Sequence, residues 1–370
     1  MSWWQRALKQ LQRKLRVNSL KSFLSLFVVG IFLGLAVAAC SGTNEGGSTP
    51  GNSATTKPKN VELTLVSFAV TRDAYKAIIP KFVAKWQQEH NQTVTFKESY
   101  GGSGSQTRAV VDGLPADITH LALALDTQKI EKAGLIQPGW ETEVPNNGIV
   151  SSSVAALVTR EGNPKGIKTW ADLAKNDVKL ITADPKTSGV ARWNFLALWN
   201  SAIKSGDEAK AVEFVTTVYN NVPVLTKDAR EATDAFFKQG QGDALINYEN
   251  EIILAQQKGL KVNYTIPDVN ISIDNPVAVV DKNVDQNGTR EVAEAFVKYL
   301  FTPEAQQEFA KVGFRPVDET VAKSKEFSEK YPPVKSLSTV QELGGWDAVQ
   351  QKFFADGAIF DQIQQAKNKQ

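Results

Sequence analysis

The stretch Asp184-Pro-Lys-Thr-Ser-Gly-Val-Ala-Arg-Trp-Asn194 joins the end of a predicted strand, residues 178–183, directly to the start of a predicted helix. After this junction, apolar residues recur close to one face of a helix: Trp193, Leu196, Trp199 and Ile203. Ser188 occupies the N-cap position, and Gly189 lets a ligand approach the backbone. The first helical N–H groups have no internal partner and lie at the positive end of the helix dipole. The junction therefore predicts an anion site built from neutral groups.

Predicted strands and helices alternate on both sides of this junction. The predicted strands are 61–66, 93–98, 118–125, 152–159, 179–183, 262–266 and 277–280. The predicted helices include 73–88, 103–111, 127–133, 208–220, 231–238 and 249–258. Such alternation predicts an α/β fold with helices on both faces of its sheets. At 370 residues we expect two lobes, because single cores stop growing near roughly 250–300 residues.

Two motifs resemble those of the bacterial sulfate-binding proteins, the solute receptors of sulfate and thiosulfate importers. Pro185–Asn194 is similar to that family's signature, and Ser99-Tyr-Gly-Gly-Ser-Gly-Ser-Gln106 is similar to its first glycine loop. Further matches are Gly242-Asp-Ala-Leu-Ile-Asn-Tyr-Glu-Asn-Glu251, Phe314-Arg-Pro316 and Gly344-Gly-Trp346. The resemblance extends from Leu63 to about Asp361 and implies a two-lobed periplasmic-binding-protein fold of the type II kind. Each lobe would be a mostly parallel sheet flanked by helices, with the ligand in the cleft.

The resemblance also implies a discontinuous first lobe. We expect residues 61–150 to form the first part of lobe 1 and residues 151–275 to form lobe 2. Residues 276–370 would supply the second part of lobe 1 and the C-terminal helices. The chain would cross between lobes near Ser151 and Asn275.

The N-terminus reads as a lipoprotein signal peptide over residues 1–39. Six basic residues and no carboxylate precede an apolar run that ends in Val37-Ala-Ala-Cys40, which resembles a lipobox. Cys40 is the only cysteine, and we expect it to carry lipid; a plain transmembrane anchor is the alternative. Residues 40–60 are small and polar, typical of a flexible tether. Removing six of the 42 basic residues leaves 36 against 40 acidic ones, so the net charge of the mature protein is about −4. After residue 40 there is no basic cluster that would indicate nucleic-acid binding.

The family's sulfate donors, carried over position by position, imply a set of ligand-binding residues. Backbone N–H groups would come from Ala69, Ser103, Gly189, Val190 and Ala229, and hydroxyl groups would come from Ser188 and Tyr248. Sulfate is deprotonated except in strong acid, so it needs donors only, and a site without carboxylates, Lys or Arg suits it.

Three of these positions depart from the family pattern. Ala69 stands where an aspartate is common, and Val190 stands where a glycine is common, so its side chain would crowd the site. Tyr248 replaces a tryptophan donor and is either a donor of different reach or a packed aromatic.

Other polar residues have structural interpretations. We expect His90 to be exposed, His120 to be a satisfied core histidine, and Arg192 to support the Ser188 loop or pair with an acid. Glu249 and Glu251 look like dipole partners at a helix start. Two isolated histidines make no metal site, and no cofactor is expected.

The leading hypothesis is a monomeric periplasmic lipoprotein that captures sulfate and delivers it to the membrane permease subunits of an ABC transporter. Thiosulfate or molybdate is the alternative ligand within the class. An extracytoplasmic enzyme is a rival of another class, but the chain offers no nucleophile–base pair. A sensor that signals on closure is a third possibility.

Overall fold

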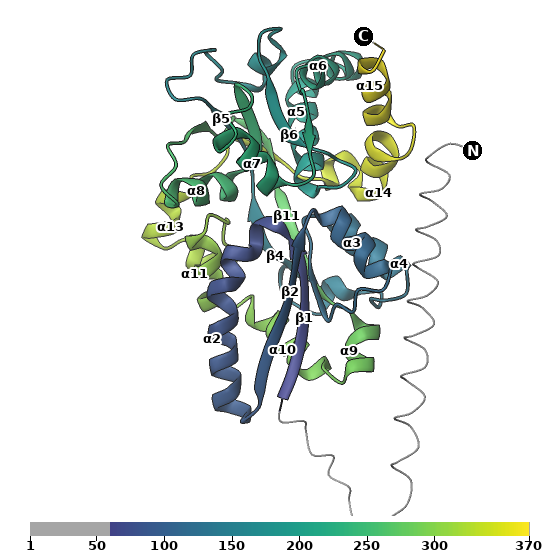
Figure 1. The fold of residues 1–370 in the computed structure, drawn as a ribbon, viewed down its shortest axis with the longest axis vertical. Helices are drawn as coiled ribbons and strands as arrows, with labels where there is room; N and C mark the ends of the chain where they lie inside the picture. Colours follow the sequence, from purple (N-terminus) through teal and green to yellow (C-terminus); the bar gives the residue numbers. More distant parts are fainter. Residues whose placement is uncertain (1–59, 370) are drawn as a thin grey trace, which may run out of the picture. The chain divides into compact units, whose positions relative to one another are not determined.

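Two five-stranded sheets organise the chain, and helices flank both. The computed structural model describes residues 60–369 (Figure 1). The first sheet has the order β2-β1-β3-β11-β4, and the second has the order β7-β6-β8-β5-β9. In the first sheet the strands are β1 (Asn60–Phe68), β2 (Thr93–Gly101), β3 (Ile118–His120), β4 (Ile149–Ser153) and β11 (Ile273–Val279). In the second they are β5 (Ala155–Thr159), β6 (Leu180–Ala183), β7 (Leu225–Thr226), β8 (Ala244–Tyr248) and β9 (Asn263–Thr265).

One strand in each sheet runs against the other four. It is β11 in the first sheet, antiparallel to β3 and β4, and β5 in the second, antiparallel to β8 and β9. The remaining pairings are parallel. The prediction of an α/β fold with two mostly parallel sheets is therefore confirmed. In both sheets the antiparallel strand is the fourth in the order.

The sheet of the first lobe is covered by the helices α2 (Arg72–His90), α3 (Ser103–Val111), α4 (Ala124–Lys132), α9 (Asp281–Asn287), α10 (Arg290–Tyr299) and α11 (Pro303–Lys311). The three that were predicted there, α2, α3 and α4, begin within three residues of the predicted positions. On α2 the buried residues Tyr75, Ile78, Phe82 and Trp86 form one face against the sheet. Phe82 packs edge-on against Phe296 of α10, with 4.9 Å between ring centroids. Apolar spacing at the helical period thus places α2 correctly.

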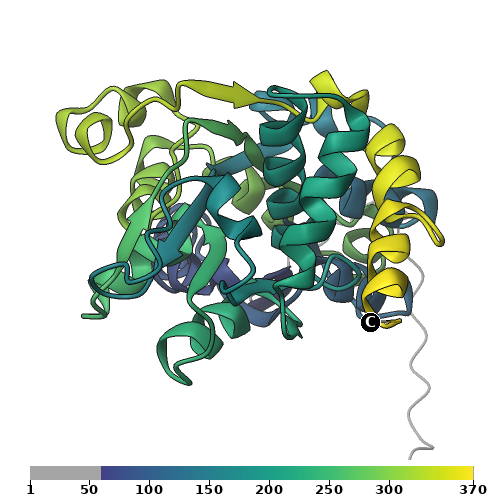
Figure 2. The same ribbon diagram turned by 90° about the horizontal axis from the view of Figure 1, so that it is seen from above.

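The second lobe is covered partly by the end of the chain. Its own helices are α5 (Gly189–Ile203), α6 (Glu208–Asn220), α7 (Ala229–Phe237) and α8 (Glu249–Gln257), and the C-terminal elements are α14 (Gly345–Val349), the π-helical turn η6 (Gln350–Phe354) and α15 (Ile359–Lys367). Figure 2 shows the C-terminal helices alongside α5 and α6. Trp346 meets Trp193 edge-on at 4.7 Å between centroids, and Phe353 lies 5.4 Å from Phe195. As a result α5 is buried nearly all round, and not on one face as its spacing predicts.

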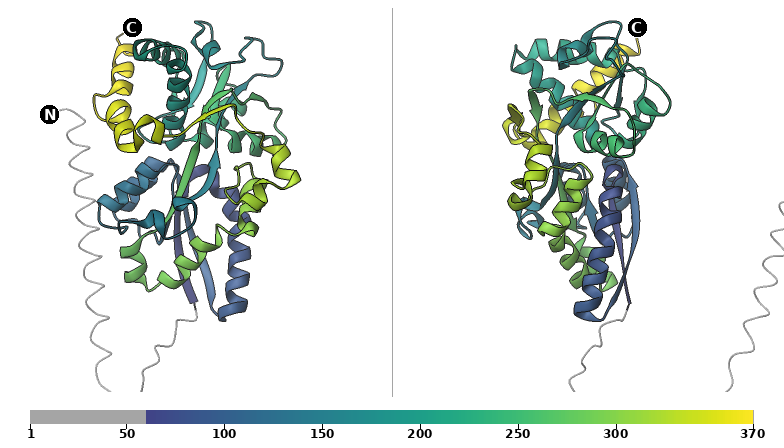
Figure 3. Two further views of the ribbon diagram at one scale, coloured as in Figure 1. Left: turned by 180° about the vertical axis from the view of Figure 1, so that it is seen from behind. Right: turned by 90° about the vertical axis from the view of Figure 1, so that its left-hand side faces the viewer.

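The predicted strand over residues 152–159 is wrong as a single element. It divides at Val154 into β4 and β5, which belong to different sheets, so the chain passes between the lobes here (Figure 3). It returns through β10 (Val269–Ile271), which pairs with β12 (Ser336–Ser338), and enters β11. Ser151 and Asn275 pair directly across β4 and β11. The division into 61–150, 151–275 and 276–370 remains a proposal, and both of its boundaries lie in strands of the first sheet, β4 and β11.

The predicted signal peptide (1–39), Cys40 and the tether (40–60, except Asn60) lie outside the described residues. Over residues 60–369, none of the helices combines the length and the apolar character that crossing a membrane requires. The short helices α12 (Glu319–Ala322) and α13 (Lys325–Lys330) follow α11.

Candidate functional site

A small cavity lies where loops from the two sheets meet. Its volume is about 10 Å³, far below the roughly 300–1,000 Å³ of pockets for drug-sized ligands. Its lining consists of Phe68, Ala69, Val70, Gly101, Gly102, Ser103, Ala122, Ser188, Gly189, Asp228, Ala229 and Tyr248. These residues end or follow strands of both sheets, namely β1, β2 and β3 in the first and β6, β7 and β8 in the second, and open α/β sheets bind ligands at such carboxyl ends. Six of the seven predicted residues are brought together here, and Val190 is the exception.

Three helices begin at this cavity. Ser103 is the first residue of α3, Gly189 of α5 and Ala229 of α7, and the residue before each has extended backbone angles. The N–H groups of a helix's first turn have no acceptor within the helix. Three helix N-termini therefore converge on one small space, which makes it favourable for a negative charge.

Ser188 precedes α5, at a position where a serine hydroxyl commonly caps the helix. Ser188 is the N-cap residue of α5, but its hydroxyl makes no capping hydrogen bond. The loop is held by its backbone instead, because the N–H groups of Thr187 and Ser188 donate to Asp184 O at 3.0 and 2.8 Å. The expected capping bond is thus wrong, and the hydroxyl remains available to a ligand.

The Tyr248 side chain lines the same cavity with an unpaired polar atom. Its hydroxyl is buried and has no hydrogen-bond partner among the described residues, and the whole residue is 1% exposed. The ring packs edge-on against Phe68, 6.0 Å between centroids. Burial raises the pKa of Tyr248 well above its usual value, so the hydroxyl keeps its proton. A buried unpaired hydroxyl is costly, and a ligand that accepts its hydrogen bond removes that cost.

Ser103 and Val190 can each offer only a backbone group. The Ser103 hydroxyl donates to Asp126 Oδ2 at 2.7 Å and accepts from Ala122 N at 3.0 Å, so it is already used. Val190 is 1% exposed within the apolar core, so its side chain does not crowd the cavity as the sequence suggested.

Charged side chains stay out of the cavity, with one exception. Asp228 lines it, and its Oδ1 accepts from Glu231 N at 2.9 Å as the N-cap of α7. Arg192 is 6% exposed but turns away: its Nε donates to Pro185 O at 2.9 Å, and its Nη1 donates to Gln350 Oε1 at 3.2 Å. The expected role of Arg192 in supporting the Ser188 loop is confirmed.

Two glycines allow the lobes to touch around the cavity. A Cβ on Gly102 would lie 2.5 Å from Thr187 O, and a Cβ on Gly189 would lie 2.5 Å from the Ala122 side chain. Both contacts join the first lobe to the second, and Trp193 Nε1 adds a 2.8 Å hydrogen bond across the same boundary to Ala122 O. The lobes therefore lie in a closed arrangement that only glycine permits at these two points.

His120 belongs to the core, as expected. It is fully buried, its Nδ1 is hydrogen-bonded to the Tyr75 hydroxyl at 2.8 Å, and its Nε2 is 3.3 Å from Ser151 Oγ. Burial lowers its pKa to about 3, so the ring is neutral. His90 is exposed, also as expected, and stacks on Trp86.

The interpretation of Glu249 and Glu251 as dipole partners is incomplete. Glu249 is held by Arg315, whose Nε and Nη2 lie 2.7 and 3.0 Å from the carboxylate. Glu251 Oε1 lies 2.7 Å from Arg230 Nε. Both glutamates are 2% exposed, and burial raises the pKa of Glu251 to about 7 although Arg230 opposes the shift.

Sequence reasoning missed part of the lining. Gly101 and Gly102 lie in the glycine loop that the family resemblance singled out, but Phe68, Val70, Ala122 and Asp228 were not named as ligand-binding residues. Ala122 carries no local signal, because only its contact with Gly189 of the other lobe makes it part of the cavity.

Two lobes that close on a small cavity lined by helix N-termini define the class of two-lobed solute-binding proteins. The profile of the bacterial extracellular solute-binding protein family matches residues 63–315. The chain is 57% identical to the sulfate-binding protein of Synechococcus elongatus over 348 residues, 94% of this chain and 97% of that protein. It is 42% identical to the sulfate-binding protein of Escherichia coli K12 over 309 residues, 82% and 93% of the two chains.

A relative named for another ligand is less similar. The thiosulfate-binding protein of Pseudomonas aeruginosa is 40% identical over 305 residues, 80% of this chain and 90% of that protein. Among solved structures, the sulfate-binding protein SubI from Mycobacterium tuberculosis matches with a TM-score of 0.73 and 37% identity, covering 80% of this chain and all of that one. The chain therefore belongs to the sulfate-binding protein family of solute receptors, which are not enzymes.

Proposed function

We propose that this protein captures sulfate outside the cytoplasmic membrane and delivers it to the permease subunits of an ABC importer. The observation that carries the proposal is the cavity itself, where three helix N-termini meet two hydroxyls, those of Ser188 and Tyr248. Sulfate accepts hydrogen bonds at every oxygen and donates none. A cavity that offers these donors and has no Lys or Arg in its lining matches that chemistry, and Oδ1 of its one carboxylate, Asp228, already accepts from Glu231 N.

The donors are assigned as the family resemblance implies. Backbone N–H groups of Ala69, Ser103, Gly189, Val190 and Ala229 would bind the anion together with the hydroxyls of Ser188 and Tyr248. Dispersing two negative charges over several dipoles avoids leaving a buried cation unpaired when the site is empty.

Thiosulfate and molybdate remain the alternatives of the same class. Relatives named for sulfate reach 57% identity, whereas the thiosulfate-binding protein of P. aeruginosa reaches 40%. This difference favours sulfate as the ligand.

We further propose that the mature protein is a monomer held at the membrane through lipid on Cys40, in the periplasm. The basic and apolar segments before Cys40 support the lipid anchor. Lipid labelling of wild type and Cys40→Ser tests it, and an unlabelled wild-type protein would contradict it.

Tyr248→Phe tests the proposed site most directly. The substitution keeps the ring and its packing but removes one hydrogen bond to a charged ligand, which is worth about 1.5–3 kcal/mol, or roughly 10–150-fold in affinity. Isothermal titration with sulfate, thiosulfate and molybdate measures the loss and ranks the ligands.

Tyr219→Phe is the matched control. Its hydroxyl is also buried without a hydrogen-bond partner among the described residues, but it lies in the second lobe away from the cavity. Tyr219→Phe should bind as wild type does. Equal sulfate affinity of Tyr248→Phe and wild type would remove Tyr248 from the site, and a wild-type protein that binds none of the three anions would overturn the function.

A further inference from the structure

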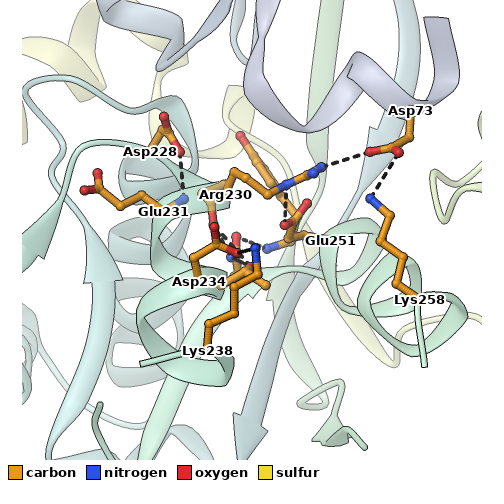
Figure 4. Close-up of polar contacts among 12 residues, drawn as sticks. Asp73, Asp228, Arg230, Glu231, Asp234, Lys238, Glu251 and Lys258 are labelled. Atoms are coloured by element: carbon orange, nitrogen blue, oxygen red, sulfur yellow. Dashed lines mark hydrogen bonds and ion pairs between the residues drawn. The ribbon is translucent and has the colours of Figure 1, made fainter. Parts of the chain in front are cut away.

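A cluster of four charged residues joins the two lobes beside the cavity. Asp73 lies in the first turn of α2, in the first lobe. Its Oδ2 is 3.3 Å from Arg230 Nη2, and its Oδ1 is 3.0 Å from Lys258 Nζ (Figure 4). Arg230 lies on α7 and Lys258 is the C-cap residue of α8, both in the second lobe. Each oxygen of one carboxylate thus holds a different cation from across the boundary.

Arg230 is fixed in place by its own lobe. Its Nε lies 2.7 Å from Glu251 Oε1, and the Glu251 side chain is 2% exposed on α8. Since α7 and α8 follow strands of the same sheet, this pair persists whether the lobes are open or closed. Asp73, in contrast, can reach Arg230 only when the lobes are together. The guanidinium is therefore held ready for Asp73 before closure.

The cluster is adjacent to the ligand site. Arg230 follows Ala229 in the sequence, and Ala229 is the first residue of α7 and lines the cavity. A contact that draws Arg230 toward α2 therefore also holds the N-terminus of α7 against the first lobe. Burial alone would raise the pKa of Asp73, but Lys258 and Arg230 outweigh it and lower the pKa, so the carboxylate is ionised.

We propose that Asp73, Arg230 and Lys258 form an interlobe latch that holds the closed form over the ligand and sets how fast the ligand leaves. This inference rests on the proposed function for the identity of the ligand. Arg230 acts here as a positioning residue and does not touch the anion. The side chains of Asp73 and Arg230 are 25% and 28% exposed, so the ion pair is only partly screened by solvent.

The direction in which Asp73→Asn changes sulfate binding separates a latch from long-range electrostatics. Asp73→Asn removes a negative charge near a site for a dianion, so long-range repulsion alone would leave binding unchanged or make it tighter. Loss of a latch weakens binding instead. We expect Asp73→Asn to speed sulfate dissociation about 3- to 30-fold, between the effects of exposed and buried ion pairs, with the association rate unchanged.

Stopped-flow tryptophan fluorescence against sulfate concentration gives both rates. Lys258→Met should speed dissociation as well. In the double variant Asp73→Asn/Lys258→Met, the increase in the dissociation rate should be smaller than the product of the two single increases. Asp177→Asn is the matched control, because Asp177 pairs with Lys165 at 2.8 Å within the second lobe. Dissociation from Asp73→Asn at the wild-type rate, or a slowed association instead, would overturn the latch.

A measurement without ligand keeps the two proposals apart. In a Cys40→Ser background, spin labels on the exposed residues Lys76 and Gln239 report the interlobe distance, because Cys40 is the only native cysteine. The closed population should fall in Asp73→Asn relative to wild type. If wild type binds no oxyanion, the proposed function fails, and equal distance distributions in the two proteins would then overturn the latch independently.

Discussion

Gly102→Ala should prevent full closure without harming the fold. Gly102 has φ −62° and ψ 134°, which any residue adopts, so alanine introduces no backbone strain. In the closed arrangement its Cβ would lie 2.5 Å from Thr187 O and 3.0 Å from Lys227 O, where ordinary contacts begin at 3.4 Å. Both oxygens belong to the backbone of the other lobe and cannot rotate away, so the lobes must separate by roughly 1 Å at this point. Overpacking of this kind costs about 1–3 kcal/mol, which is roughly 5–150-fold in sulfate affinity.

The ligand-free protein should respond in the opposite direction. Replacing glycine by alanine where the backbone allows it stabilises a protein by about 0.4–1 kcal/mol, because the unfolded chain loses freedom. The expected result is weaker sulfate binding by titration calorimetry together with an unchanged or raised midpoint of thermal unfolding without sulfate.

Gly104→Ala, in the first turn of α3, is a graded control. Its Cβ would lie 3.3 Å from the same oxygen, Thr187 O, so the required shift is a tenth of an ångström, and the loss should stay within about threefold. Equal losses for Gly102→Ala and Gly104→Ala, or a fall in ligand-free stability that matches the loss of affinity, would refute the argument from closure.

Three further predictions concern the site and the core. Ser188→Ala should lower sulfate affinity roughly 10–150-fold in titrations but leave the unfolding midpoint of ligand-free protein unchanged, because its hydroxyl caps nothing; a lowered midpoint would show a structural role. Phosphate, which carries a proton near neutral pH, should bind at least roughly 10–100-fold more weakly than sulfate in competition titrations, and equal affinity would show that Asp228 accepts a hydrogen bond from phosphate. The neutral form of His120 stabilises the fold fully above pH 6.5, and this contribution is lost as pH falls toward about 3. It amounts to at most roughly 4–5 kcal/mol, so urea unfolding of His120→Gln should depend less on pH across that window, and parallel pH profiles would contradict the assignment.

The starts of helices at the site were predictable because their signals are local. Ser103–Val111 has the predicted bounds, and α5 begins at Gly189, directly after the N-cap position assigned to Ser188. A polar or small residue before an apolar period marks such a start within a few residues of sequence. The seven ligand-binding residues came from the family resemblance and not from such signals, and six of them line one cavity.

The contacts between lobes were not predictable in this way. Val154 continues an apolar β-rich run, and only the partner strands of β4 and β5 show that the chain changes sheets there. Asp73 and Arg230 are 157 positions apart, so their pairing depends on how two separate lobes meet. Glu249 likewise has the local signal of a helix-start residue, and this signal says nothing of its ion pair with Arg315, 66 positions away.

Several arginines lie near the site, but each is bound to other groups of the protein, and helix N-termini face the cavity instead. Arg192 is bound to a loop carbonyl, Arg315 to Glu249, and Arg230 to Glu251 and Asp73. When sulfate leaves, helix N–H groups are rehydrated at little cost, whereas an arginine buried against the anion would be left unpaired. Paired cations can instead act between the lobes, where their contacts form and break with closure. Substitutions at helix-start donors should therefore change how well the anion is held, and substitutions in the Asp73 cluster should change how long the lobes stay closed.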